Sequence, residues 1–287
     1  MIPAPFDYAR ANTIDEALSL LAQDEDAKIV AGGHSLIPAM KLRLTQPSLL
    51  VDIGRIKDLS YVREENGQIR IGATTTHYQL ESSDLLKRIC PLLPDCASRI
   101  GDMQVRNKGT IGGSLAHADP AGDWPAAVIA LNAEIVALSK TGERVIKADD
   151  FFVDLLTTAL QPGEILREIR IHKVNGRTGH AYAKMAHPAS GFAVVGVAAN
   201  LSLNGSSKCK RASIGITGVS AKAYRAAGVE QRLNGATLSD ESIQTAASYA
   251  ADGTEVNGDL FASAEYRRHL AEVYMRRAIS AAVENAR

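Results

Sequence analysis

Two short segments combine paired glycines with hydroxyl side chains, the residue types that bind phosphate groups through the backbone. Residues 109–114 read Gly-Thr-Ile-Gly-Gly-Ser, and residues 31–36 read Ala-Gly-Gly-His-Ser-Leu after an apolar run. Glycine adopts positive φ and lets a ligand approach the backbone, and successive N–H groups form a concave anion site. Neither segment contains lysine or arginine, or matches G-x-x-x-x-G-K-S/T or G-x-G-x-x-G. The segments predict either tight turns or two loops whose backbone donors hold a dinucleotide from opposite sides.

Histidine and carboxylate side chains near these segments raise two further hypotheses. His117, Asp119 and Asp123 have a spacing that a metal site could use, but the Asp-Trp-Pro helix start at Asp123 favours capping by its carboxylate. His34 has no neighbour in sequence that completes a metal site or a catalytic pair. We therefore expect His34 to be a histidine of a binding pocket, and we assign no metal ligand and no catalytic residue to this chain.

The cysteines restrict the redox chemistry of the chain itself. Cys90, Cys96 and Cys209 show no C-x-x-C spacing, and their odd number argues against a disulfide framework. Three thiols cannot supply four thiolates to an iron–sulfur cluster. We expect buried structural thiols, and any cluster in an electron path on another chain.

In their order and separation, the two glycine segments resemble those of the FAD-binding medium subunits of the molybdenum hydroxylases. That family includes carbon monoxide dehydrogenase, quinoline and nicotine hydroxylases, and the flavin domain of xanthine dehydrogenase. The resemblance covers nearly the whole chain, from Ile-Pro-Ala-Pro-Phe-Asp-Tyr at residues 2–8 to Ala-Glu-Tyr-Arg-Arg-His-Leu at residues 264–270.

The resemblance implies an α+β fold, with a two-subdomain FAD-binding domain of the xanthine dehydrogenase flavin-domain (PCMH) type. A C-terminal domain with a small antiparallel sheet and helices would follow. It also implies FAD on this chain, and a molybdenum cofactor and [2Fe-2S] clusters on a molybdopterin large subunit and an iron–sulfur small subunit, in a dimer of heterotrimers. Electrons would reach FAD singly from the clusters and leave as a pair to an external acceptor. The chain would bind, orient and tune the flavin.

The resemblance also assigns positions to the cofactor. Lys184, an edge-strand lysine by sequence alone, matches a lysine at the flavin ring, where a cation near N1 and O2 stabilises reduced flavin. Ile100 and Leu166 match apolar positions that line the ring, although both also suit a core. Phe192 stands where carbon monoxide dehydrogenase has tyrosine, so a hydroxyl is missing, and Asp123 would contact FAD besides capping a helix. The FAD-binding residues predicted in this way are Lys28, Ile29, Ala31, Gly32, Gly33, His34, Ser35, Leu36, Ile100, Gly109, Thr110, Ile111, Gly112, Gly113, Ser114, His117, Asp123, Leu166, Lys184 and Phe192.

Two other functions remain open at this point. A free-standing flavoprotein reductase of the same fold would need a proton donor near flavin N5, and the sequence nominates none. A nucleotide-binding assembly subunit would have no redox role. The substrate of the complex and the final electron acceptor are not encoded in these residues.

Composition narrows the class of protein further. Hydrophobic residues make up 46% and charged residues 22% of 287 residues, which is typical of a globular protein with an ample core. The 32 basic side chains balance 32 acidic ones, so no footprint for nucleic acid or an anionic membrane is visible. No apolar run is long enough to span a membrane, and the N-terminus lacks the pattern of a signal peptide. We expect a cytoplasmic protein.

Periodicity divides the chain into three units, at residues 1 to about 54, about 60–173 and 177–287. The resemblance makes the first two the subdomains of a FAD-binding domain, residues 1–173, and the third the C-terminal domain. The polar, glycine-bearing stretch 173–179 is the predicted boundary. A capping pattern at Thr13 predicts the first helix, and helices are also expected from residues 92, 123, 239 and 263. The predicted strands are residues 28–31, 49–53, 69–73, 135–139, 144–147, 165–171, 192–203 and 213–219.

Overall fold

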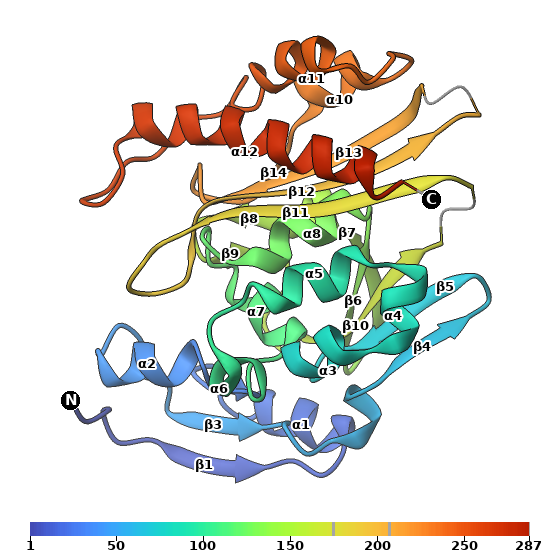
Figure 1. Cartoon of the computed structure of the whole chain (residues 1–287). Helices are drawn as coiled ribbons and strands as arrows, with labels where there is room; N and C mark the ends of the chain where they lie inside the picture. The colour runs from blue at the N-terminus through green and yellow to red at the C-terminus, as the bar shows by residue number, and fades with distance from the viewer. Residues whose placement is uncertain (174–175, 206–207, 287) are drawn as a thin grey trace.

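A computed structural model describes residues 1–173, 176–205 and 208–286, and the chain forms three successive units that each have their own sheet and core (Figure 1). The first unit is a parallel sheet with strand order β1-β3-β2. Its helix α1 begins where the Thr13 hydroxyl accepts a hydrogen bond from the Glu16 N–H, as predicted. Its elements are β1 (Asp7–Arg10), α1 (Ile14–Leu21), β2 (Lys28–Val30), α2 (Leu36–Lys41) and β3 (Leu49–Asp52).

The second unit is a five-stranded antiparallel sheet with strand order β4-β5-β10-β6-β7, whose apolar face is covered by short helices. Its core surrounds Trp124 and Phe151, which are fully buried. The strands are β4 (Val62–Glu65), β5 (Gln68–Gly72), β6 (Glu134–Ser139), β7 (Gly142–Lys147) and β10 (Ile165–His172), with the small pair β8 (Phe152–Asp154) and β9 (Thr157–Thr158). The helices are η1 (Lys57–Leu59), α3 (His77–Ser82), α4 (Asp84–Ile89), α5 (Leu92–Ser98), α6 (Met103–Arg106), α7 (Ile111–His117), α8 (Asp123–Ala130) and α9 (Ala148–Phe151).

The C-terminal unit is a four-stranded antiparallel sheet that lies between α8 of the second unit and the long helix α12 (Figure 1). This layer order buries both faces of β12 (Ala193–Leu203), which explains why its first seven residues are apolar or glycine. The elements are β11 (Thr178–Ala186), β12 (Ala193–Leu203), β13 (Cys209–Thr217), β14 (Tyr224–Arg225), α10 (Ala227–Leu233), α11 (Asp240–Ala247) and α12 (Ala264–Glu284). The predicted α+β architecture is therefore confirmed.

Several local predictions need correction. β1, β4 and α10 were not predicted from the sequence, because their short segments have weak periodicity. An arginine pair at positions 267 and 268 favours a solvated face or subunit contacts, but Arg267 is buried, and its guanidinium donates to the carbonyls of Val194 and Gly218. Residues 174 and 175 of the predicted boundary, and residues 206 and 207, which the Asn-Gly-Ser-Ser sequence predicts to be part of a turn, lie outside the described residues.

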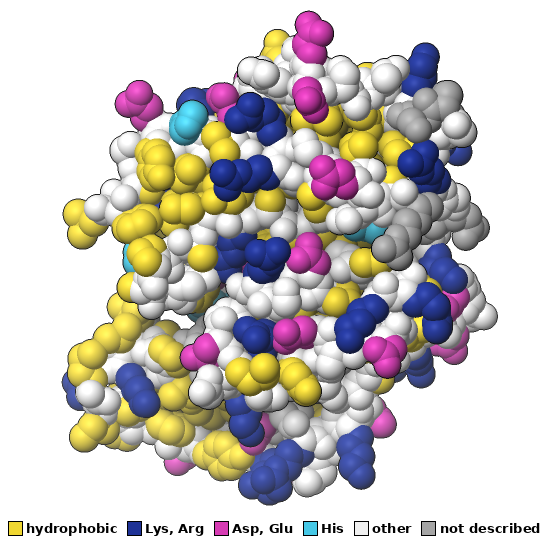
Figure 2. All heavy atoms as spheres, viewed as in Figure 1, with side chains coloured by type: hydrophobic (Ala, Val, Ile, Leu, Met, Phe, Trp, Pro, Cys, Tyr) yellow, Lys and Arg dark blue, Asp and Glu magenta, His cyan; other side chains and the backbone are white. Residues whose placement is uncertain are grey.

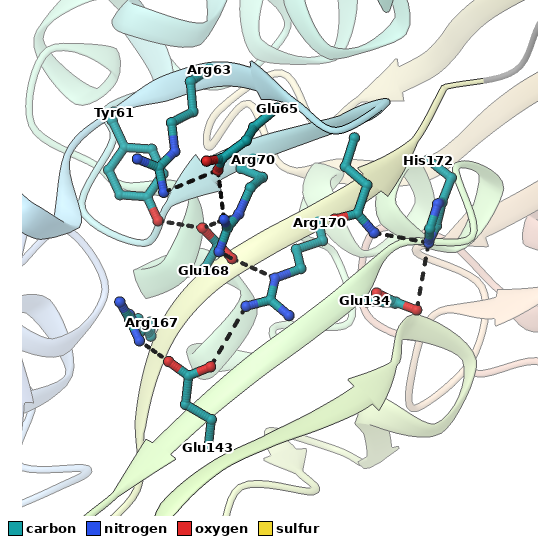
Figure 3. A network of polar contacts seen from close by, with 11 residues as sticks. Tyr61, Arg63, Glu65, Arg70, Glu134, Glu143, Arg167, Glu168, Arg170 and His172 are labelled. Atoms are coloured by element: carbon teal, nitrogen blue, oxygen red, sulfur yellow. Dashed lines mark hydrogen bonds and ion pairs between the residues drawn. The ribbon is translucent and has the colours of Figure 1, made fainter.

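One face of the five-stranded sheet carries a network of charges that we call the charged ladder: Tyr61, Glu65, Arg70, Glu168 and Arg170 (Figure 3). Cross-strand pairing places Arg70 opposite Arg170, and the Glu168 carboxylate between them accepts hydrogen bonds from both. Elsewhere basic and acidic side chains are intermixed over the face seen in Figure 2. No helix within the described residues is long and apolar enough to cross a membrane.

Candidate cofactor site

The two glycine segments lie against each other at the junction of the first and second units. A Cβ atom at Gly32 would overlap the carbonyl oxygen of Lys108 and would lie 2.9 Å from the Cα of Gly109. Glycine at position 32 is therefore required for this close approach of two backbones. The structure brings together the segments that the sequence predicts to act as a pair, and we call their contact region the cradle: residues 32–35 together with Lys108, Gly109 and His77.

The first segment connects β2 to α2 and presents unpaired backbone donors. Gly33 has φ +72°, a left-handed conformation that favours glycine. His34 Nδ1 lies 2.8 Å from the carbonyl oxygen of Gly32, so that nitrogen carries the proton and folds the side chain onto its own loop. Across the residues that the structure describes, the four consecutive N–H groups of Gly32–Ser35 donate no hydrogen bond. Such a run forms a backbone nest for an anion.

The second segment differs from the prediction of a loop with exposed donors. Helix α7 begins at Ile111, and the N–H groups of Ile111–Ser114 donate to the carbonyls of Thr75, Ala73 and Thr110 and to the Thr110 hydroxyl. Gly112 allows this packing, because a Cβ atom there would lie 2.6 Å from the Cβ of Ala73. The prediction that these four N–H groups form an anion nest is therefore wrong. Contact of the segment with the cofactor remains a prediction.

His77 is a polar residue of the cradle that the sequence prediction missed. Its imidazole is buried, its Nδ1 lies 3.0 Å from Nε1 of the buried Trp124, and its Nε2 faces Gly109. Burial, and then the nearby charges of His34 and Arg106, lower the pKa of His77 to about 4. A single histidine after three threonines carries no local pattern, so only the fold reveals it.

Asp123 and Lys184 form a second buried polar cluster, between α8 and β11. Lys184 Nζ donates to the Asp123 carboxylate and to the Arg99 carbonyl, each at 2.9 Å, and the Tyr182 hydroxyl donates to the other carboxylate oxygen at 2.5 Å. Burial raises the pKa of Asp123, and Lys184 and Tyr182 oppose that shift. The predicted helix cap is wrong, because Gly122 is the N-cap and Asp123 is the first helical residue. Lys184 does lie on an edge strand, but its side chain is 3% exposed.

The remaining predicted positions lie on several elements. Gly191, next to the half-exposed Phe192, approaches Gly101, so the loop before β12 lies beside the turn at Ile100. Leu166 is buried in β10. His117 Nε2 is 4.0 Å from an Asp119 oxygen, whereas Asp123 bonds to Tyr182 and Lys184, so the metal-like triplet does not converge. The other predicted positions are Lys28 and Ile29 in β2, Ala31 after it, and Ser35 and Leu36 at the start of α2.

Comparison with known proteins decides the family. Residues 4–173 match the model of the FAD binding domain in molybdopterin dehydrogenase, and residues 180–282 match the CO dehydrogenase flavoprotein C-terminal domain. The chain belongs to the FAD-binding medium subunits of the molybdenum hydroxylases. This confirms the family predicted from the glycine segments.

Individual members of the family are similar to this chain over their full length. The carbon monoxide dehydrogenase medium chain of Hydrogenophaga pseudoflava is 40% identical, over 98% of each chain. The 6-hydroxypseudooxynicotine dehydrogenase complex subunit alpha of Paenarthrobacter nicotinovorans is 37% identical, over 100% of this chain and 97% of that subunit. A solved carbon monoxide dehydrogenase from Hydrogenophaga pseudoflava superposes with a TM-score of 0.96 at 39% identity, covering 100% of both chains.

The cradle fits the cofactor that defines this family. FAD carries a pyrophosphate. The four N–H groups of Gly32–Ser35, which have no acceptor in the described part of the chain, offer donors to such an anion without a lysine or arginine in the loop. The contact of Gly32 with Lys108 and Gly109 places the second segment beside these donors. The geometry therefore supports a dinucleotide held where the first two units meet.

Proposed function

We propose that this chain is the flavin subunit of a molybdenum hydroxylase. It binds FAD at the cradle, accepts electrons from [2Fe-2S] clusters on a partner subunit and passes them to an external acceptor. Besides family membership, one observation carries the proposal: four successive N–H groups of Gly32–Ser35 have no partner in the described residues where the two glycine segments meet.

The residues of this chain bind and orient the cofactor. Bound FAD supplies the electron-transfer chemistry through its ring. The N–H groups of Gly32–Ser35 hold the pyrophosphate, and α7, packed against Ala73, fixes the second segment beside them. Ile100, Leu166 and Phe192 are assigned to the flavin ring, and phenylalanine at position 192 contributes an apolar surface without a hydroxyl. The buried Lys184 supplies a positive charge whose strength is moderated by Asp123.

We further propose that the partners are an iron–sulfur small subunit and a molybdopterin large subunit, assembled as a dimer of heterotrimers in the cytoplasm. Apolar side chains gather at the lower left of Figure 2, in the region of the first unit. The exposed large apolar side chains next to β1 and α2 in the sequence include Met1, Ile2, Leu42 and Leu44. Apolar surface of this kind marks protein–protein contacts. The three buried thiols, unpaired among the described residues, agree with a reducing compartment.

Two glycine variants with the same backbone strain test the proposed site. Gly33 has φ +72° and Gly67, in the turn between β4 and β5, has φ +74°. Valine at either position strains the backbone by at least about 1–2 kcal/mol. We expect Gly33→Val to fold without flavin and Gly67→Val to retain it, as measured by the visible flavin absorption of the purified full-length chain and by its thermal unfolding.

Equal flavin content in the two variants would contradict the cradle as the FAD site. A native chain that is colourless and takes up no added FAD would instead favour a non-redox assembly subunit. Purification of the native complex distinguishes the remaining alternative, because a free-standing reductase would carry flavin without a cluster-bearing chain and a molybdenum-bearing chain.

A further inference from the structure

His77 lies at the line where the two glycine segments touch. The backbone N–H of His77 donates to the Gly109 carbonyl at 3.0 Å, and this bond fixes the start of α3 against the second segment. A Cβ atom at Gly109 would lie 2.6 Å from His77 Nε2, and a Cβ atom at Gly32 would lie 2.9 Å from the Gly109 Cα. Gly109 therefore packs against both Gly32 and the His77 ring.

Trp124 determines which nitrogen of His77 carries the proton. The indole Nε1–H is a donor only, and it lies 3.0 Å from Nδ1 of His77. Nδ1 must accept, so a neutral His77 carries its proton on Nε2. Trp124 is fully buried, and its ring lies against the imidazole with centroids 5.9 Å apart. The orientation of the Nε2–H donor is thus fixed by the core.

This oriented donor has no acceptor among the residues that the structure describes. Among the described residues no hydrogen bond is made by His77 Nε2. The fully buried side-chain atoms without a partner in that part of the chain are Thr74 Oγ1 and His180 Nδ1, so His77 Nε2 is reached by solvent. His77 is 5% exposed, and its Nδ1 accepts from Trp124 whereas its Nε2 has no partner among the described residues. The Nε2–H group is therefore positioned to donate to a bound ligand.

The His77 imidazole also stays neutral across physiological pH. The charged groups that face the imidazole are His34 from the first segment and Arg106 from α6, and Arg106 is itself paired with Glu81. Burial, with these two groups, holds the pKa of His77 at about 4. His77 therefore contributes a neutral, directional hydrogen bond, whereas the adjacent loop contributes backbone donors.

We infer that His77 is an FAD-binding residue whose Nε2–H donates to an oxygen of the cofactor's pyrophosphate, beside the N–H groups of Gly32–Ser35. This inference rests on the proposed FAD-binding function and adds a ligand contact to it. The acceptor is assigned to the pyrophosphate because the neighbouring unpaired donors form an anion site.

A pair of variants separates the hydrogen bond from the packing of the histidine. His77→Leu removes the Nε2 donor, while His77→Gln places an amide N–H near the position of Nε2. Both remove Nδ1, the atom that accepts from the Trp124 indole, so both should lower the thermal stability of the apoprotein. We expect His77→Leu to bind FAD about 10- to 100-fold more weakly, the range for a lost hydrogen bond to a charged group, and His77→Gln to recover most of the affinity.

The measurements are FAD titrations of the full-length apoprotein by flavin fluorescence, and competition by ADP, which carries a pyrophosphate without the flavin. ADP affinity should fall by the same factor as FAD affinity in His77→Leu. Equal FAD affinity in the leucine and glutamine variants would overturn the hydrogen bond, and unchanged ADP affinity would overturn the pyrophosphate assignment. If the native chain binds no FAD, the proposed function itself fails, an outcome distinct from both.

Discussion

The charged ladder and the cradle are both partly buried polar regions, but they satisfy their hydrogen bonds differently. In the ladder, Glu168 is 1% exposed, and its carboxylate accepts from Arg70 at 2.8 and 2.9 Å, from Arg170 at 2.5 Å and from Tyr61 at 2.5 Å (Figure 3). In the cradle, the backbone donors of Gly32–Ser35 have no acceptor among the described residues.

This difference separates a structural network from a binding site. Burial alone would raise the pKa of Glu168, but hydrogen bonds from Arg70, Tyr61 and Arg170 lower it, so the carboxylate stays charged within a complete network. Unpaired polar groups are costly in a protein interior. The open donors of Gly32–Ser35 lie on a partly exposed loop, where a ligand can reach them. The ladder has the larger number of ion pairs, but the cradle is where ligand binding is expected.

The largest expected effect is on stability, from a change in the ladder. Glu168→Gln removes the negative charge between Arg70 and Arg170, and breaking a buried ion pair in this way costs about 3–5 kcal/mol. FAD affinity should stay within about twofold, since the ladder has no part in the cradle. Chemical denaturation of the apoprotein and FAD titration give the two values.

Glu143→Gln is the matched control for this prediction. Glu143 pairs with Arg167 and Arg170, but its side chain is 34% exposed. Surface pairs contribute about 0–1 kcal/mol, so this variant should be close to native stability. A Glu168→Gln protein that is fully stable, or one that loses FAD while folded, would remove the distinction between the two regions.

Acidification should lower the free energy of unfolding through His77 of the cradle and through Glu168 of the ladder, each in its own pH range. The pKa of His77 is about 4 in the folded chain, against its usual 6.5, because of burial and the charges of His34 and Arg106. The unfolded chain therefore binds the proton first, and about 3 kcal/mol of unfolding free energy is lost as pH falls from 6.5 to 4. Glu168 has a lowered pKa, so its contribution is complete above pH 4.5 and is lost below it.

Denaturant unfolding at a series of pH values checks this order. His77→Gln should remove the decline between pH 6.5 and 4.5, and Glu168→Gln should remove only the decline below pH 4.5. If His77→Gln loses stability as steeply as the native chain over the first window, another group titrates there and the buried neutral histidine is not its source.

The sequence predicted the conformation of the first glycine segment better than that of the second. The segment after β2 is a loop with glycine at positive φ, as paired glycines suggest. The segment of Gly112 and Gly113 is helical, against the low helix propensity of glycine, because Thr110 caps it and Gly112 packs on Ala73. Tertiary contact with Ala73 outweighs local propensity, and a sequence pattern does not contain that contact.

The polar partners were the least predictable part of the site. Trp124 lies 47 residues after His77, and Tyr182 lies 59 residues after Asp123. Helix-start signals near Asp123 were correct to one residue, but they did not indicate that its carboxylate is shared with Tyr182 and Lys184 of the C-terminal unit. Short-range patterns identified eight of the strands and the family. Pairings between separate units required the fold.

The smallest expected effect is on the reduction potential of the bound flavin, and it tests the buried pair as a third kind of polar region. The Asp123–Lys184 pair is complete like the ladder, yet family resemblance assigns both residues to the cofactor. If the Lys184 charge acts on the flavin ring, Lys184→Met lowers the potential and Asp123→Asn raises it, because the second change leaves that charge uncompensated. Each shift should be a few tens of millivolts, since about 30 mV corresponds to about 1.4 kcal/mol for a two-electron couple.

Redox titration of the FAD-loaded chain gives the potential, and thermal unfolding records the separate loss of stability from breaking the pair. Opposite shifts in the two variants support an electrostatic role at the flavin. Equal losses of stability with an unchanged potential would make the pair a structural contact between α8 and β11, like the ladder.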